Sequence, residues 1–215
     1  MKGETAMPRL AQFMFIIMAL MVTAVTSAKE FDEGIEYVRI NPVVPTASGN
    51  KIEVVEMFWY GCPHCFQFEP YLQKWLQKKP KNVEFVRVPA TFRPLWKLHA
   101  RAYYTAEVLG VSEKLHKPMF DAFHLERNKL DSEKSLRKLF VKHGVKGSDF
   151  DDVFHSFAVE TKLARATDLT QRYGITGVPS VIINGKFRTS SKISGHANML
   201  EVVDDVIRKE GRARK

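Results

Sequence analysis

The sequence predicts an α/β protein in which a β-sheet is layered by helices and interrupted by a helical insertion. Three observations predict this class. The apolar, β-branched and aromatic run at residues 52–60 (IEVVEMFWY) is typical of a buried strand, and a helical pattern follows it. Helix follows helix over residues 94–166, where alternating strand patterns do not occur. Strand signals return at residues 180–188, ahead of a last amphipathic helix.

The first half of the chain predicts a strand–helix–strand unit. A short edge strand is expected near residues 35–40, before the central strand. A helix then begins at Cys62 or Pro63, because proline suits the first helical position, where its missing N–H is not needed. Pro70 is expected to kink this helix. Alternation at residues 82–88 (NVEFVRV) predicts the next strand.

The helical block divides into five expected helices. Glycines follow three of them, and Ser132 is a candidate N-cap for another. The expected helices cover residues 95–109, 112–123, 132–143, 148–157 and 159–173.

A hairpin and a helix end the chain. Residues 180–183 (SVII) form a strand, and Asn184-Gly185 is a strong two-residue hairpin turn. Residues 186–188 return as the second strand of the hairpin, and residues 198–209 carry apolar positions at helical spacings.

The N-terminus has the pattern of an export signal. Lys2 and Arg9 precede an uninterrupted apolar run at residues 13–22, and small residues follow it. The run is too short to span a bilayer alone. Cleavage after Ala28 fits the pattern, and cleavage after Ala24 or Ser27 is an alternative. An uncleaved membrane anchor is the alternative. The sequence therefore predicts an exported protein.

The chain is basic, with a formal net charge of +9. The charge falls only to +8 when residues 1–28 are removed, because they hold two basic residues and one acidic residue. Lys and Arg are scattered among Glu and Asp, which is typical of a solvated surface rather than a nucleic-acid interface. Export also argues against nucleic acid as a partner.

The two cysteines of the chain lie three residues apart, in the motif Cys62-Pro63-His64-Cys65. This spacing places the sulfur atoms about one helical turn apart, close enough to bridge. A zinc site would need further ligands at suitable spacings, and neither another cysteine nor a suitable histidine pair supplies them. A c-type haem would need histidine after Cys65, where Phe66 stands. A structural disulfide closing so short a loop would stabilise little. Dithiol–disulfide exchange is the interpretation that the motif favours.

An apolar strand, a dithiol at a helix start and a C-terminal hairpin plus helix together describe a thioredoxin-like fold with a helical insertion domain. We divide the chain into a signal peptide at residues 1–28, a thioredoxin-like domain at 29–93 and 167–215, and the helical insertion at 94–166.

Two segments carry a resemblance to a known family. Residues 56–65 (EMFWYGCPHC) with residues 67–69 (QFE) form the first, and residues 177–180 (GVPS) leading into 181–186 (VIINGK) form the second. In both segments the chain resembles the DsbA family of periplasmic thiol:disulfide oxidoreductases in the thioredoxin superfamily. The resemblance covers essentially the whole mature chain and includes the helical insertion.

Cys62 is the expected nucleophile. At a helix N-terminus its thiolate faces free backbone N–H groups and the positive end of the helix dipole, which lowers the pKa of the thiol. His64 can add to this stabilisation, although it can also be an exposed helix histidine without a role. Pro63 stiffens the turn. Cys65 is expected to be the more buried, resolving thiol, and the two form the redox-active disulfide.

The resemblance implies three further site residues. Pro179 corresponds to a cis-proline that faces the disulfide, where an ordinary trans proline is the alternative. Val178 then presents backbone groups that can pair with an extended substrate peptide. Glu56 corresponds to a buried acid beneath the dithiol with a raised pKa, where a strand-end residue pointing to water is the alternative.

The resemblance implies an enzyme that donates the Cys62–Cys65 disulfide to newly exported proteins. A DsbB-like membrane quinone oxidoreductase would re-oxidise it, and the enzyme would be a monomer without metal or other cofactor. A disulfide isomerase or reductase kept in the reduced state is the alternative function. A chaperone-like binding module with a structural disulfide is the third hypothesis.

Overall fold

The computed structural model describes residues 29–213 of the 215-residue chain. The signal peptide predicted at residues 1–28 lies outside the described residues. Within the described part, no helix combines the length and the apolar character that a membrane crossing requires.

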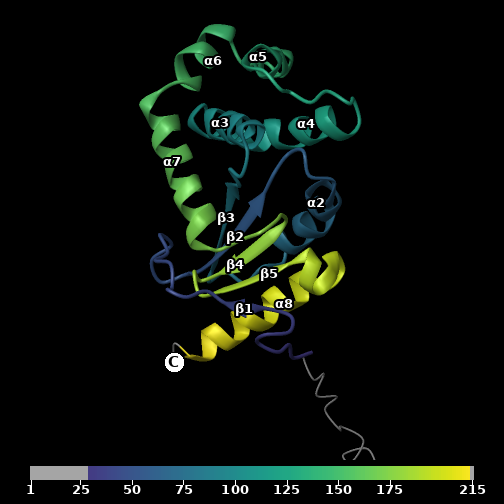
Figure 1. Cartoon of the computed structure of the whole chain (residues 1–215), viewed down its shortest axis with the longest axis vertical. Helices are drawn as coiled ribbons and strands as arrows, with labels where there is room; N and C mark the ends of the chain where they lie inside the picture. The colour runs from purple at the N-terminus through teal and green to yellow at the C-terminus, as the bar shows by residue number, and fades with distance from the viewer. Residues whose placement is uncertain (1–28, 214–215) are drawn as a thin grey trace, which may run out of the picture.

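Five strands form one mixed sheet at the centre of the molecule (Figure 1). The order is β1-β5-β4-β2-β3; β2 and β3 pair in parallel, and the other neighbours pair antiparallel. The β2–β3 register places Glu56 opposite Arg87. The strands are β1 (Val38–Arg39), β2 (Ile52–Phe58), β3 (Val83–Pro89), β4 (Ser180–Ile183) and β5 (Phe187–Ser190).

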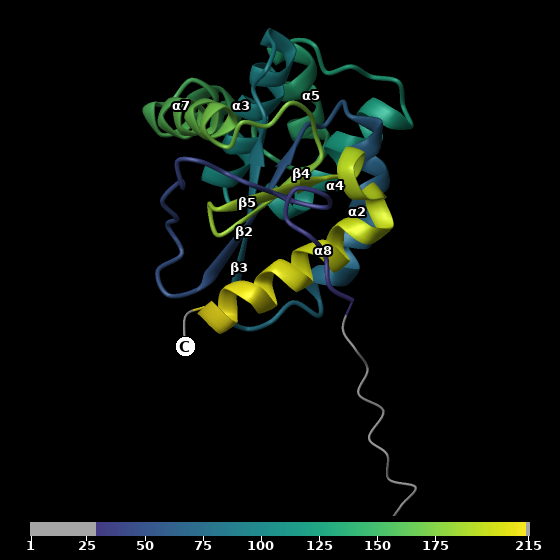
Figure 2. The ribbon, with the colours of Figure 1, turned by 60° about the horizontal axis from the view of Figure 1, so that its bottom comes forward.

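Helices cover both faces of the sheet. On one face, α2 (Pro63–Leu76) and α8 (Ser191–Ala213) pack against each other and bury one set of strand side chains, including Val54 and Val181 (Figure 2). On the other face, α3 (Pro94–Val108) and α7 (Phe157–Arg172) bury the alternate set. Successive strand side chains point to opposite faces, which is why a nearly continuous apolar run forms a strand covered on both sides.

The insertion closes over one end of the sheet. Between α3 and α7 lie α4 (Ser112–His124), α5 (Glu133–Lys142) and α6 (Gly147–Phe154), as Figure 1 shows. Their apolar faces form a third core together with Phe58, Cys62 and Cys65. The insertion therefore packs directly against the dithiol.

Most predicted elements are confirmed, including the helix start at Pro63 and the strand at 180–183. Ser132 caps α5, because its hydroxyl accepts from the Ser135 N–H. The Asn184-Gly185 turn has positive φ at both residues, as the predicted hairpin turn requires.

Several boundaries differ from the prediction. The central strand ends at Phe58, and residues 59–61 form the turn into α2. Pro70 lies inside α2, and the predicted kink at this residue stays a prediction. The last helix begins at Ser191 rather than at 198, and Gly195 (φ 73°, ψ 161°) breaks it near its start. The predicted domain boundary at residue 166 lies inside α7.

Candidate active site: the Cys62–Cys65 dithiol

The dithiol stands where β2 turns into α2. Cys62 is the N-cap residue of α2 with an extended backbone (φ −87°, ψ 117°), and Pro63 opens the helix. The Cys62 N–H donates to the Trp59 carbonyl at 3.0 Å, and the Cys62 carbonyl accepts from Phe66 at 3.1 Å. Proline lacks the backbone N–H that a helix interior uses, and the first helical position does not need this donor, so Pro63 suits the start of α2.

The two sulfur atoms differ in exposure. Both cysteines are free thiols; Cys62 is 8 % exposed and Cys65 is 0 % exposed. Cys62 is therefore the more accessible of the two cysteines to a thiolate of another protein.

Cys62 has a low thiol pKa. The hydrogen bond with the Cys65 thiol is the largest cause, and the backbone N–H groups of Cys65 and His64 and the charge of His64 add to it. Although burial opposes them, these contacts lower the pKa of Cys62 to about 6. At pH 7 the reduced protein therefore carries a thiolate at Cys62.

The environment of Cys65 acts in the opposite direction. Burial first, and then the hydrogen bond and charge of Cys62, raise the pKa of the Cys65 thiol well above its ordinary value. The reduced pair thus holds one thiolate and one thiol rather than sharing the charge.

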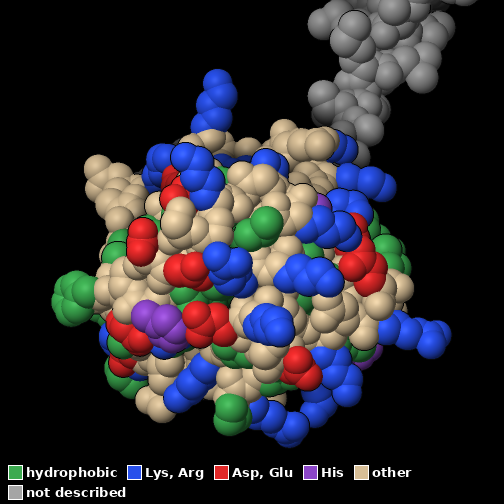
Figure 3. Space-filling view, turned by 90° about the horizontal axis from the view of Figure 1, so that it is seen from above, with side chains coloured by type: hydrophobic (Ala, Val, Ile, Leu, Met, Phe, Trp, Pro, Cys, Tyr) green, Lys and Arg blue, Asp and Glu red, His purple; other side chains and the backbone are tan. Residues whose placement is uncertain are grey.

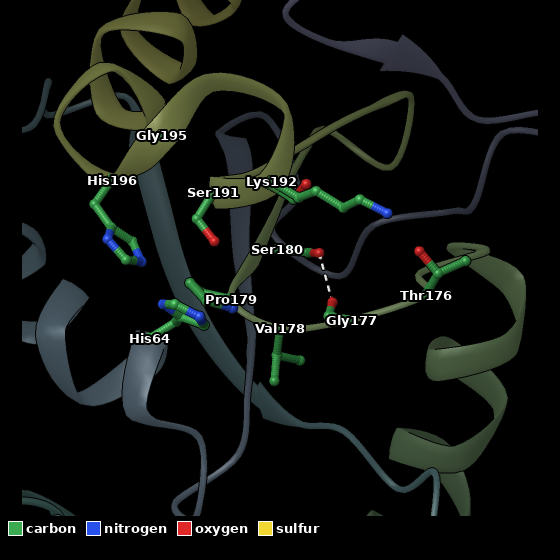
Figure 4. A pocket seen from close by; sticks show the side chains of 11 residues that line it. His64, Thr176, Gly177, Val178, Pro179, Ser180, Ser191, Lys192, Gly195 and His196 are labelled. Atoms are coloured by element: carbon green, nitrogen blue, oxygen red, sulfur yellow. Dashed lines mark hydrogen bonds between the residues drawn. The ribbon is translucent and has the colours of Figure 1, made fainter.

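The distant G-V-P segment faces the dithiol. The Val178–Pro179 peptide bond is cis, and the Cys62 sulfur lies 3.4 Å from the Val178 carbonyl oxygen, to which it donates when it is protonated. The segment is held locally by the Ser180 hydroxyl, which donates to the Gly177 carbonyl at 2.8 Å (Figure 4). Two motifs 116 residues apart in sequence thus meet at one sulfur atom.

A pocket of about 530 Å³ opens beside this junction. The loop at residues 176–180 forms one wall, and the first turns of α8 form another (Figure 4). His64 lies at its edge, and its ring centroid is 5.4 Å from that of His196 on α8.

Glu56 lies inside the molecule, so the alternative of a strand-end residue pointing to water is wrong. Its side chain is 0 % exposed on β2, and Arg87 Nε donates to its Oε2 at 3.2 Å. Burial first, and then the negative charge of Glu69, raise the pKa of Glu56 to about 8, although Arg87 acts in the opposite direction. The charge of Glu56 in turn contributes to the raised pKa of Cys65.

Arg87, Glu69 and His116 form a buried network with Glu56 that sequence reasoning missed. Arg87 lies 3.5 Å from Glu69, Glu69 lies 3.0 Å from the His116 Nε2, and the His116 Nδ1 lies 3.1 Å from the Tyr60 hydroxyl. Burial opposes ionisation of Glu69, but the hydrogen bond and charge of His116 and the charge of Arg87 lower the pKa of that carboxyl. One signal was present: Arg87 stands between two valines in β3.

His196 is a further residue that the sequence analysis did not assign to the site. The last helix was expected to begin at residue 198, which left His196 in a loop. Its ring also lies 6.3 Å from the Phe68 ring, so it covers the first turns of α2. The early start of α8 is what brings it to the dithiol.

Metal ligands do not gather near the dithiol. Among residues 29–213, no group of three or more His, Cys, Asp or Glu side chains is placed to hold a metal ion.

Comparison with known proteins identifies the relatives of this chain. The family model described as "DSBA-like thioredoxin domain" matches residues 53–206. The thiol:disulfide interchange protein DsbA of Pseudomonas syringae is 39% identical over 190 residues, which is 88% of this chain and 89% of that protein. The crystal structure of Pseudomonas aeruginosa DsbA superposes with a TM-score of 0.82 at 38% identity, covering 86% of this chain and 97% of that one.

A third relative is known with a peptide. A Proteus mirabilis DsbA carrying a cysteine-to-serine substitution was solved with the non-covalently bound peptide PWATCDS. It is 26% identical to this chain with a TM-score of 0.72, covering 83% of this chain and 98% of that one.

Proposed function

This chain belongs to the DsbA family of thiol:disulfide oxidoreductases, and from that premise we propose that it donates its Cys62–Cys65 disulfide to newly exported proteins in the periplasm. The single observation that carries the direction of transfer is the opposite shift of the two thiol pKa values, to about 6 at Cys62 and upward at Cys65. A stabilised Cys62 thiolate favours the reduced pair, and a protein that favours its reduced form is a strong oxidant.

The proposed reaction has two steps. A client thiolate attacks the Cys62 sulfur, the Cys62–Cys65 bond breaks, and Cys65 leaves and takes up a proton. A second client thiolate then attacks the client sulfur of the mixed disulfide and expels Cys62 as a thiolate. The client loses two electrons and gains a disulfide, and the protein gains both electrons as one thiol and one thiolate. Attack at Cys62 fits the exposure of the two sulfur atoms.

The surrounding residues have distinct proposed roles. His64 stabilises the Cys62 thiolate by its charge, and Pro63 begins the helix that presents it. Glu56 is the proposed proton source for Cys65, because an acid with a pKa of about 8 still holds its proton at pH 7.

Clients are proposed to bind along the Val178–Pro179 segment. The Val178 carbonyl points at the Cys62 sulfur, and an extended chain pairing with this backbone would place its own cysteine there. The Proteus mirabilis relative was solved with a non-covalently bound peptide, which supports peptide binding by this chain.

Partners and location complete the proposal. We propose that residues 1–28 direct export, that the mature chain acts as a monomer, and that a DsbB-like membrane quinone oxidoreductase restores its disulfide. The division into a thioredoxin-like domain (29–93 and 167–215) and a helical insertion (94–166) is part of the same proposal. Lys and Arg are interspersed with Asp and Glu on the face seen in Figure 3, which is a poor match for nucleic acid.

The test is the equilibrium of the Cys62–Cys65 disulfide with glutathione buffers, read by thiol trapping. DsbA is itself the reference for a strong oxidant, at about −120 mV, and thioredoxin lies near −270 mV. We expect a midpoint toward the DsbA end. A midpoint near thioredoxin would overturn the donor proposal and favour an isomerase or reductase kept reduced.

A further inference from the structure

The pocket beside the dithiol is lined by basic and hydroxyl side chains. Lys192, His64 and His196 line it, and four hydroxyl residues of the 176–180 loop, the end of β5 and the start of α8 share its walls. Lys192 extends from the first turn of α8 along the side of the pocket nearer Thr176, while His196 and His64 lie on the opposite side (Figure 4). None of its lining residues is acidic. The lining therefore offers hydrogen-bond donors and positive charge without a competing carboxylate.

One ring nitrogen of His196, in the lining of this pocket, is available for a further hydrogen bond. Its Nε2 is buried and has no hydrogen-bond partner among the described residues. Burial, and then the charge of His64, lower the pKa of His196. A buried polar atom without a partner is costly, and a negative ligand group close to both imidazoles would relieve that cost.

The groove on the other side of α2 holds charges of both signs. It lies between α2 and α4, has a volume of about 610 Å³, and its carboxylates Glu69 and Asp121 are paired with His116 and Lys117 of the same lining. Of these two cavities, the pocket beside Val178 is therefore the one whose lining offers a cation without an acidic partner.

The position of the pocket beside Cys62 indicates which ligand would occupy it. Val178 and Pro179 are part of its wall, and the Val178 carbonyl contacts the Cys62 sulfur. A client chain that pairs with this backbone places its cysteine at Cys62 and a neighbouring side chain at the pocket. We propose that the pocket is a specificity site for an aspartate or glutamate next to the reacting cysteine of the client, and that Lys192 and His196 determine this preference.

This inference rests on the proposed function, and a peptide series separates the two. Dithiol peptides with a Gly-Ser spacer carry Asp, Asn or Lys immediately before or after the first cysteine. The second-order rate of their oxidation by the oxidised full-length mature protein is read by quenched thiol alkylation. At low ionic strength, about 0.02 M, we expect the better placed Asp peptide to react about fivefold faster than its Lys counterpart. At about 0.5 M salt the ratio should fall toward one, because exposed charges are then screened.

Two variants test the assignment to this pocket. In the double variant Lys192→Gln, His196→Ala, the oxidation rate of the Asp peptide is expected to be less than about twofold that of the Lys peptide. Lys138→Gln on α5 removes one exposed charge away from the pocket and should leave the ratio unchanged. Circular dichroism establishes that each variant is folded.

The outcomes are distinguishable. Equal rates for the Asp, Asn and Lys peptides at low salt would overturn the specificity site while leaving disulfide donation intact. A preference for Asp that survives in the double variant would place the determinant elsewhere. Failure of every peptide to be oxidised would instead count against the proposed function.

Discussion

Cys62 and Cys65 lie three positions apart, and the pKa values of their thiols are shifted in opposite directions. Cys62 has a helix start, two backbone N–H groups and a hydrogen bond to lower the pKa of its thiol, and Cys65 has burial to raise it. The C-x-x-C spacing predicts that the sulfurs can bridge. The asymmetry that decides which sulfur carries the charge comes from the surroundings of each.

At the same scale, Glu56 makes stability depend on pH. Its folded pKa of about 8 lies above the ordinary 4.5, so the unfolded state releases this proton first as pH rises. The free energy of unfolding therefore falls between about pH 4.5 and 8, by up to about 1.4 kcal/mol per pH unit from this group. Glu56→Gln should remove that fall, so that the reduced variant becomes more stable than the reduced wild type as pH rises. Urea unfolding of the reduced wild type and the reduced variant from pH 5 to 8 measures this difference in the free energy of unfolding.

Glu84→Gln is the matched control for this experiment. Glu84 is exposed on the neighbouring strand, and its hydrogen bond with Lys51 lowers the pKa of that carboxyl. Glu84 is therefore ionised throughout pH 5 to 8, and its substitution should shift the stability curve without changing its slope. A stability difference between wild type and Glu56→Gln that stays constant over this range would contradict the raised pKa.

Secondary-structure elements were largely predictable because their signals are local. Proline at the first helical position, a serine cap and Asn-Gly between two short strands each act within a few residues. The start of α8 was missed for the same reason. Residues 191–197 have a weak helical pattern, and Gly195 breaks the helix there, so a local pattern placed its start too late.

Alanine substitutions at Gly110 and Gly185 distinguish the cost of backbone strain from the cost of steric crowding. Gly110 (φ 68°) and Gly185 (φ 63°) both have positive φ, but a Cβ at Gly110 meets nothing within 4 Å. A Cβ at Gly185 would lie 1.9 Å from the Val44 carbonyl oxygen. Gly110→Ala should cost about 1–2 kcal/mol from the left-handed conformation alone. Gly185→Ala should cost at least about 1–3 kcal/mol more, because backbone atoms must move.

Thermal and urea unfolding of the two alanine variants measure this difference. The Val44 N–H donates to the Gly185 carbonyl at 3.0 Å, which holds the two segments together. An equal loss of unfolding free energy in Gly185→Ala and Gly110→Ala would contradict this prediction, because the segment around Val44 would then move away at no cost.

For the whole molecule, the redox state and the stability are linked. The folded pKa of Cys62, about 6, lies below its ordinary value of 9.0, so the thiolate stabilises the reduced fold at high pH. This contribution is complete above about pH 9, amounts to about 1 kcal/mol at pH 7, and is lost as pH falls through about 6. The stability of the reduced form relative to the oxidised form should therefore decrease from pH 8 to pH 5.

Urea unfolding of both redox forms across this range tests the linkage. The disulfide also restricts the unfolded chain, but that effect does not depend on pH and cancels from the trend. Cys62→Ser keeps Glu56 and the rest of the network and should lack the Cys62 contribution. A reduced-minus-oxidised difference that does not change with pH would contradict the low pKa of Cys62.

Local patterns were enough to specify the thioredoxin-like class, the helical insertion and the redox motif. Apolar periodicity, proline and glycine positions and the C-x-x-C spacing are all readable within a short window of residues. Folding was needed to decide the neighbours of the dithiol: Val178 at the Cys62 sulfur, Arg87 at the buried Glu56, and His196 over the pocket. These contacts join segments far apart in sequence. Desolvation and charge interactions depend on distance in space and on burial, and the order of residues along a chain contains neither directly.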